Sequence, residues 1–579
     1  MTMDLRDRLI AAHDAGRLLA EINTSALQSE EAVIDALRDL HNDGSINLVA
    51  AFQSLKNAGD EGINFFFLRQ VFQGLLPHLN SPVGPMMECV LHLYKESGAD
   101  ITADFILQHF IAFCTKDPAR PQEALSRIVR EPERHVELLP AILISGSKLD
   151  PGKWLHEALG LLQSANLEIR RGAVFSLGRF EVLGSPADLD AALAALERVV
   201  ASEADSLIRS AALRSAVGLL PHDKSQERRV LSLLDGILTG GDDHALFSAA
   251  EILSQQVQTI SVELRNPLLQ HLQRVQARSK GTLRQIDFAL SRLMNSGAHN
   301  EAIKFVEEYL RNHASEVSIQ DFPMLASAVR LDEMLLGAVI TRWFLQGDPT
   351  LCHFASAILG SRHVSTPLKL KVSSQELSPK TPQSILFLAK KVVGYLYLLP
   401  ITAISLLLSL MEETDDSGLL EQLGALVFDP LLVSFTGSAA DYVAEEAQVR
   451  TGVVKTTLQK TKETFDDYVA SLKAVGYIAE LNPFTNQREA NYRRVSLEFR
   501  QSVNSAQKQS PLLSMVHRSV LLYGNSSIDY VAGPNGETHR QSMPLRSIGT
   551  KFELPRLTLI DPIGIEHYVR QLKAEKQPP

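Results

Sequence analysis

A phrase that recurs at a constant spacing constrains the fold of this chain more than any other feature. Residues 168–178 read EIRRGAVFSLG and residues 207–218 read LIRSAALRSAVG, with the two Ile-Arg pairs 39 residues apart. A looser copy, LFSAAEIL at 246–253, follows at a spacing of 38. Repetition with a period of roughly 20–50 residues is typical of arrays built from small helical units. The sequence therefore predicts a mainly α protein in which short helices stack in series.

Helical segments alternate with short polar connections between about residues 153 and 362. Apolar residues within these segments recur with the period of an amphipathic helix. We expect regular helix pairs at 154–162 with 169–180, 190–200 with 207–219, 228–238 with 244–253, and 264–275 with 283–293. Two more diverged pairs are expected at 301–310 with 324–329 and at 334–345 with 351–359.

A pair of small residues occurs at the same position in each copy of the phrase. Small side chains let neighbouring helices approach closely, so we expect close contacts at Gly172-Ala173, Ala211-Ala212 and Ala249-Ala250. We expect the larger apolar residues of the phrase to fill the layer between successive helices; these are Phe175, Leu177, Leu213 and Ile252.

The phrase resembles the HEAT repeats of the armadillo-like superfamily. An Ile-Arg pair, a small-small pair and a closing Leu-Gly pair occur in full at 169–178, and the pattern is well kept at 208–218. It is degraded at 246–253 and at 283–293, so the specific resemblance covers residues 153–295. The resemblance implies an α-solenoid of HEAT-like helical pairs that binds other macromolecules on a curved face.

The same resemblance bears on the arginines of the repeated region. HEAT-like arrays often use such arginines to bridge adjacent repeats, and we favour that role here. Lining of a concave face is the alternative. The arginines concerned are Arg170, Arg171, Arg179, Arg209 and Arg214.

Changes of pattern divide the chain into regions with different expected structures. The expected fold is mainly α, an α-solenoid with a small α+β module at its C-terminal end. The regions are an irregular helical region at 1–150, the HEAT-like array at 151–362, a linker at 363–383, a buried helical hairpin with connecting helices at 384–440, and a basic α+β module at 441–579.

Residues 516–557 change to a period of two, which indicates short strands. We expect these strands at 516–523, 528–531, 543–548 and 551–557, with a hairpin turn in the Gly-Pro-Asn-Gly run at 533–536. A final helix is expected at 563–573, with Asp561 as its N-cap and Pro562 at its first position.

Bulk properties bear on the compartment and the partners. The net charge is −10 overall, with +6 on residues 450–579 and −16 on the remainder. The three cysteines are scattered, which fits a reducing compartment. The N-terminus has no apolar segment of the kind found in signal peptides. We therefore expect a cytoplasmic protein and leave its oligomeric state open.

An uncharged run at 392–411 is long enough to suggest a membrane span. Pro400 lies at its middle, Lys390-Lys391 adjoin one end, and Ser405 and Ser409 fall on one helical face. Two buried helices that break at Pro400 explain these features better. A membrane-associated hairpin is the alternative.

No phosphate loop, dinucleotide fingerprint, nucleophile elbow or paired metal-ligand motif occurs in the sequence, so no cofactor is expected. A polar cluster at the expected hairpin comprises Asp529, Glu537 and His539, with His517 and Lys551 on nearby expected strands. Two acids and a lysine that converge at a strand end can hold a catalytic metal. Solvation of the hairpin tip explains the same residues, and we favour that interpretation.

Basic residues on two expected helices near residues 450–510 form the clearest binding signal. One helix carries Lys455, Lys460, Lys462 and Lys473. The other carries Arg488, Arg493, Arg494 and Arg500, with Tyr492 and Phe499 between them. Cations can contact phosphates and aromatic rings can stack on unpaired bases. Ordinary ion pairs with Glu489 and Glu498, or docking of this basic end on the acidic remainder of the chain, explain the same residues, and we favour that interpretation. Recognition of a protein is a further alternative.

The sequence as a whole favours a non-enzymatic scaffold or adaptor that binds a protein partner within a multi-subunit complex. The observations behind this expectation are the repeat and the lack of a catalytic motif. A nucleic-acid-binding subunit that uses the basic helices is one alternative. A metal-dependent hydrolase in the C-terminal module is the other.

Overall fold

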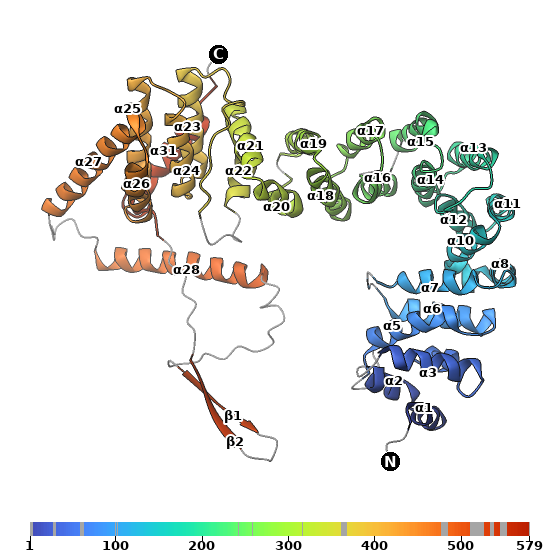
Figure 1. Ribbon diagram of the computed structural model, residues 1–579. Coiled ribbons are helices and arrows are strands. Elements are labelled where there is room, and N and C mark those ends of the chain that lie inside the picture. Colours follow the sequence, from blue (N-terminus) through green and yellow to red (C-terminus); the bar gives the residue numbers. More distant parts are fainter. Residues whose placement is uncertain are drawn as a thin grey trace. The chain divides into compact units, whose positions relative to one another are not determined.

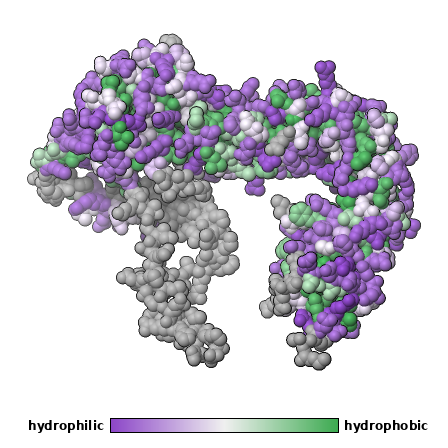
Figure 2. All heavy atoms as spheres, viewed as in Figure 1, coloured by the Kyte–Doolittle hydropathy of each residue, from purple (hydrophilic) through white to green (hydrophobic). Residues whose placement is uncertain are grey.

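The computed structural model describes residues 4–26, 30–57, 63–98, 100, 102–240, 242–257, 259–314, 316–360, 367–475, 484–509, 526–532, 538–544 and 553–577. The described chain is mainly helical, which confirms the expected fold class at that level. It divides into two compact units, Met1–Leu331 and Asp332–Pro579. On the face seen in Figure 2, hydrophilic residues dominate the described surface.

Unit 1 begins with short helices of varied length, shown in blue in Figure 1. Their bounds are α1 Leu5–Asp14, α2 Leu18–Ala26, α3 Glu30–Asn42, α4 Leu48–Gln53, α5 Phe65–Leu75, η1 Leu76–His78, α6 Val83–Glu96, α7 Phe105–Cys114, α8 Ala119–Arg130, α9 Pro132–His135, η2 Val136–Leu138 and α10 Leu139–Leu149.

The remainder of unit 1 alternates between two rows of helices (Figure 1). Helices α10, α12, α14, α16, α18 and α20 pack side by side in one row, and α11, α13, α15 and α17 pack in the other. Their bounds are α11 Pro151–Leu161, α12 Leu167–Leu177, α13 Pro186–Ser202, α14 Ser206–Leu219, η3 Lys224–Gln226, α15 Glu227–Thr239, α16 Asp243–Gln256, α17 Val262–Leu272, α18 Lys280–Asn295, α19 His299–Asn312, η4 Ile319–Asp321 and α20 Pro323–Leu331. The helices expected from the sequence in this part are present, and three of the expected pairs pack together: α11 with α12, α13 with α14, and α15 with α16.

A polar residue caps the start of each helix that carries the repeated phrase. The Asn166 side chain accepts hydrogen bonds from the backbone N–H groups of residues 168 and 169. Asp205 and Asp242 cap α14 and α16 in the same way. Such caps satisfy backbone donors that the helix itself leaves unpaired, and each stabilises a helix by about 1 kcal/mol. The caps fix where each copy of the phrase becomes helical.

The backbones of α12 and α14 approach closely at the last residues of the phrase. A Cβ on Gly178 would lie 2.3 Å from Ser215 Cα, and a Cβ on Gly218 would lie 2.2 Å from the Gly178 carbonyl oxygen. Ser215 Oγ also donates a 2.7 Å hydrogen bond to the Val174 carbonyl oxygen. The two backbones are therefore in contact at Gly178 and Gly218. These glycines follow the small-small pairs at which the sequence predicted the contact.

Unit 2 contains the remaining helices and one hairpin. Their bounds are α21 Glu333–Gln346, α22 Pro349–Leu359, α23 Pro382–Leu396, α24 Pro400–Met411, α25 Ser417–Leu426, the π-helix η5 Val427–Leu432, α26 Ser438–Val449, α27 Gly452–Val475, α28 Thr485–Gln509, β1 Ser526–Ala532, β2 Thr538–Pro544, α30 Arg556–Ile560 and α31 Pro562–Ala574. The strands β1 and β2 pair antiparallel, with Ser526 opposite Pro544 and Ala532 opposite Thr538.

The uncharged run at 392–411 folds as parts of two buried helices, α23 and α24, and α24 begins at Pro400. Among the described helices, none combines the length and the apolar character needed to cross a membrane. Ser405 and Ser409 accept hydrogen bonds from the backbone N–H groups of Leu370 and Val372, at 3.0 and 3.1 Å. The two serines therefore hold part of the expected linker as a buried extended segment against α24.

The C-terminal residues return to pack on α23 (Figure 1). The expected final helix is α31, and Asp561 caps it by accepting a hydrogen bond from the Gly564 N–H group. Lys391, only 2% exposed, donates to the Lys573 carbonyl oxygen at the end of α31. A Cβ on Gly394 would lie 3.0 Å from the backbone nitrogen of Lys573, so glycine at this position permits close packing of α23 and α31.

One of the expected strands is contradicted at its end, and others lie wholly or partly outside the described residues. The strand expected at 551–557 is wrong at its end, because α30 begins at Arg556 and Pro555 precedes it as the N-cap. A proline favours the start of a helix over the interior of a strand. Of the strand expected at 543–548, Met543 and Pro544 belong to β2. The strand expected at 516–523 and the turn at 533–536 lie outside the described residues.

Replacing Gly218 by alanine tests the backbone contact. Because the new Cβ would overlap a carbonyl oxygen of α12, we expect Gly218→Ala to lower the free energy of unfolding by about 1–3 kcal/mol. Gly236→Ala is the matched control, because no atom lies within 4 Å of its Cβ position in α15. There, alanine should stabilise the helix by about 0.5–1 kcal/mol. Urea unfolding followed by circular dichroism measures both, and equal changes would contradict the contact.

Candidate partner-binding groove in unit 1

A groove of about 1030 Å³ runs across successive helices of unit 1. Most of its lining residues lie on α7, α10, α12 and α14 or at their ends. These four helices are consecutive neighbours, because α7 packs on α10, α10 on α12, and α12 on α14. We call this feature the unit 1 groove.

On each helix, lining residues are spaced at positions i, i+4 and i+7, which lie on one helical face. Equivalent positions of successive helices therefore line up across the groove. Near the helix starts lies an acidic row of Asp104, Glu137 and Glu168. Next comes a row of Gln108, Ala141, Gly172 and Ala211, in which all but the first are small, and then an apolar row of Ile111, Ile144 and Phe175. Near the helix ends lie Lys148, Arg179 and Glu181, and Arg171 adjoins the acidic row. The groove therefore has one side that is mainly acidic, one side that is mainly basic, and a largely apolar floor.

Two arginines flank the aromatic residue of the floor. The Arg179 guanidinium carbon lies 3.4 Å from the centroid of the Phe175 ring, and that of Arg214 lies 5.6 Å from it. Phe175 is half-buried, and its ring contacts Arg179 as well as Arg214 of the neighbouring α14. It therefore fills the layer between helices only in part. Leu177, Leu213 and Ile252 are buried, as expected.

The charges of the groove are unevenly compensated. Arg214 pairs with Glu251 on α16 at 2.7 Å, and Arg171 pairs with Glu168 at 3.0 Å. Lys148 pairs with Glu181 at 2.7 Å. Within the described part of the chain, no carboxylate forms an ion pair with Arg179, which donates one hydrogen bond to the Phe175 carbonyl oxygen.

Arg179 is exposed overall, yet the groove wall removes part of its hydration. This desolvation, together with the positive charge of Arg214, lowers the pKa of Arg179; Glu251 and Asp104 oppose the shift, and the net pKa is about 10. The guanidinium is still protonated at neutral pH. An anion that binds at this site would stabilise the charged form of Arg179.

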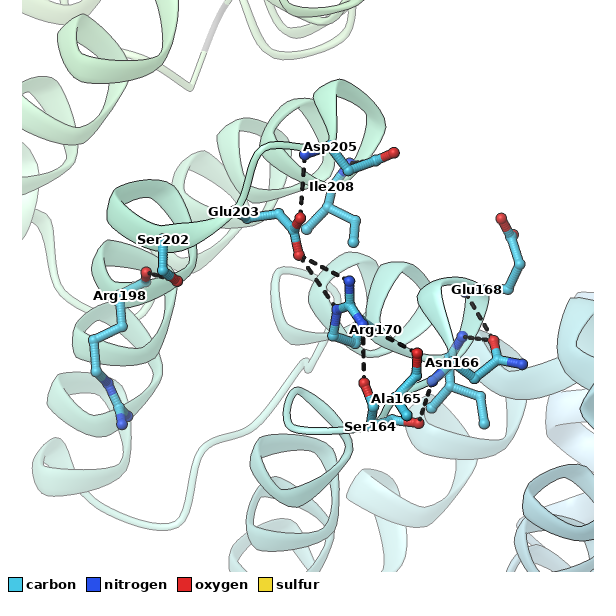
Figure 3. A network of polar contacts seen from close by, with 11 residues as sticks. Ser164, Ala165, Asn166, Glu168, Arg170, Arg198, Ser202, Glu203, Asp205 and Ile208 are labelled. Carbon is cyan, nitrogen blue, oxygen red and sulfur yellow. Dashed lines mark hydrogen bonds and ion pairs between the residues drawn. The ribbon is translucent and has the colours of Figure 1, made fainter.

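Other arginines of the repeat bridge neighbouring elements, as the resemblance implied. Figure 3 shows Arg170 between the start of α12 and the segment before α14. Its guanidinium donates to Glu203 at 3.1 Å and to the Ser164 carbonyl oxygen at 3.0 Å. Arg209 donates to the Gly236 carbonyl oxygen at 3.2 Å. Arg170 and Arg209 are thus bridging residues, and Arg171 and Arg179 line the groove. Arg214 does both, because it lines the groove and pairs with Glu251 on the neighbouring α16.

The candidate arginines of the C-terminal region lie on one exposed helix. Arg488, Arg493, Arg494 and Arg500 are all exposed on α28. Arg493 forms a 3.6 Å ion pair with Glu489 four residues earlier, which was one of the alternatives for this helix. On α27, Lys455 is half-buried and Lys462 pairs with Asp466.

The expected polar cluster can be placed only by its backbone. Asp529 lies on β1 opposite Gln541, and His539 lies on β2 opposite Val531. The side chains of both, and the whole of Glu537, lie outside the described residues. In the described part of the chain, no group of three or more His, Cys, Asp or Glu residues could hold a metal ion.

No protein-family model matches the chain, and no curated protein matches it. Among solved structures, the chain is similar to an engineered protein whose crystal structure was determined by the Northeast Structural Genomics Consortium. The two are 14% identical, over 80% of this chain and 99% of that chain, with a TM-score of 0.17. At this TM-score the similarity says nothing about fold or function.

The division between bridging and groove arginines predicts different effects on stability. Arg170→Ala should lower the free energy of unfolding by about 1.5–3 kcal/mol, because it removes part-buried hydrogen bonds to a carboxylate and a carbonyl oxygen. Arg171→Ala should change it by about 0–1 kcal/mol, because its ion pair is solvent-exposed. Chemical denaturation of the two variants measures the difference, and a larger loss for Arg171→Ala would refute the division.

Proposed function

We propose that this protein is a non-enzymatic scaffold, an α-solenoid of HEAT-like helical pairs that binds a protein partner in the unit 1 groove. The observation that supports this most is the common register of the groove residues on α7, α10, α12 and α14. An apolar floor with charged residues of both signs along its sides suits a peptide segment, which combines apolar and charged side chains. We further propose that the scaffold works within a multi-subunit complex in the cytoplasm.

The dimensions of the groove support a peptide rather than a small ligand. Neighbouring helices lie about 8–10 Å apart, so four successive helices span about 24–30 Å. An extended segment of about eight residues covers that length at about 3.3 Å per residue. The groove volume of about 1030 Å³ is at the upper limit of ordinary small-molecule pockets.

A photoreactive residue at position 175 tests this proposal. Incorporation of p-benzoylphenylalanine in place of Phe175, in the full chain expressed in its native host, should give a discrete crosslink to a partner protein. The same residue in place of Arg198 is the control, because Arg198 is exposed on α13 and, in Figure 3, points away from the network of Arg170. Mass spectrometry identifies the crosslinked peptides. Absence of a crosslink specific to position 175 would refute binding in the groove.

A second candidate function is nucleic-acid binding by the small α+β module that we propose at the C-terminal end. The observation that favours it is α28, where the exposed arginines accompany Tyr492, which is 75% exposed. Arginines can neutralise phosphates and an exposed ring can stack on a base.

Gel shifts with single-stranded RNA and DNA at 50 and 200 mM salt, chosen as about a fourfold range, test this second candidate. Joint replacement of Arg493, Arg494 and Arg500 by glutamate should abolish any shift seen at the lower salt. Glutamate in place of Lys462 is the control, because that lysine already pairs with Asp466. A shift that the triple replacement leaves unchanged would exclude α28 as the binding element.

A further inference from the structure

The Arg179 side chain has the geometry of a prepared carboxylate receptor. An arginine carries five N–H donors, and Arg179 uses one of them on the Phe175 carbonyl oxygen. Its guanidinium lies 3.4 Å from the ring centroid of Phe175. Stacking on the ring restrains the plane of the guanidinium while leaving its edge able to donate two parallel hydrogen bonds. Planar, bidentate donors of this kind match a carboxylate better than they match a neutral group.

The second arginine of the cluster raises the local positive potential. Arg214 lies on the same ring, 5.6 Å from its centroid, and Glu251 compensates its charge from α16. Arg179 has no such ion pair with any described carboxylate. A partner carboxylate at Arg179, whose side chain is exposed, would complete the compensation, and burial of that pair by the bound partner would strengthen the attraction.

The opposite side of the groove restricts what can bring that carboxylate. Asp104, Glu137 and Glu168 form the acidic row at the helix starts. A nucleic-acid strand, which carries phosphates along its whole length, would place negative charge against this row. A peptide can instead place a single acidic residue at Arg179 and uncharged or basic residues elsewhere. The charge pattern therefore favours a peptide over a polyanion.

The floor beside the cluster specifies the neighbours of the acidic residue. Ile111 and Ile144 continue the row that contains Phe175. The smaller residues Ala141, Gly172 and Ala211 form the row next to it and leave space above them. Large apolar side chains of a partner can fill that space and remove apolar surface from water.

The next inference rests on the proposed function of the unit 1 groove as a partner site. For that site, the geometry points to a specific ligand class. We infer that the unit 1 groove recognises an acidic, apolar peptide segment, in which an Asp or Glu carboxylate binds Arg179 and adjacent Leu, Ile or Phe side chains pack on the floor. Arg179 is thus the residue that sets specificity, and Phe175 is the residue that positions it.

Selection from a random twelve-residue peptide display library on the full-length protein identifies the preferred sequences. Synthetic fluorescein-labelled copies of the selected peptides are then measured by fluorescence polarisation. We expect enrichment of an acidic residue next to large apolar residues. Arg179→Glu should weaken binding about 10- to 100-fold, as expected for loss of a hydrogen bond to a charged group. Arg198→Glu should leave binding unchanged; Arg198, like Arg179, bonds a carbonyl oxygen of its own helix.

A charge-swapped peptide separates recognition from a structural effect of the variant. The peptide in which the acidic residue is replaced by lysine should bind Arg179→Glu better than it binds the natural protein. A variant that had merely lost structure would bind neither peptide. Equal melting temperatures of the Arg179→Glu and Arg198→Glu proteins provide the matching check on folding.

The outcomes distinguish this inference from the function on which it rests. Leu207→Trp places a large side chain in the groove at an exposed position. If Leu207→Trp abolishes binding of the selected peptides but these peptides show no preference for an acidic residue, the inference is overturned and the groove remains the partner site. Failure of every selected peptide to respond to Leu207→Trp would overturn the groove itself. Displacement of the peptide by a single-stranded oligonucleotide, dependent on Arg179, would also overturn the inference.

Discussion

The structure of the repeated region depends on one close contact between backbones. At Gly178 and Gly218 the helices α12 and α14 approach so closely that a Cβ on either residue would overlap main-chain atoms of the other helix. Ser215, buried beside them, adds a hydrogen bond to the Val174 carbonyl oxygen. Glycine at these positions sets the distance between the helices, and packed cores cannot change such distances gradually. The alignment of side chains elsewhere on the two helices follows from this contact.

The unit 1 groove is a consequence of that alignment. On α12 and α14, which the contact holds in register, equivalent positions of the phrase continue the rows that begin on α7 and α10. Successive residues of a helix point about 100° apart, so neighbouring positions take different roles. Arg170 therefore bridges to Glu203, whereas Arg171, the next residue, lines the groove.

The repeat and the helical period predicted the helices from α11 to α20 closely, since apolar period and capping residues are local signals. They did not predict the part that Phe175 plays. An aromatic residue in an apolar pattern is most often buried, and only the position of Arg179 over its ring shows that it belongs to the groove. Ser405 and Ser409 likewise accept hydrogen bonds from an extended segment more than 30 residues earlier, a relation that no local pattern carries.

The sequence by itself determined that the chain is mainly helical, where its helices in the repeat begin, and which residues recur at each register. These properties depend on interactions between residues a few positions apart. Only the tertiary structure decided which arginines bridge and which remain available, because compensation of a charge depends on carboxylates brought close by packing. Arg214 gains Glu251 in this way, and Arg179 gains no carboxylate among the described residues.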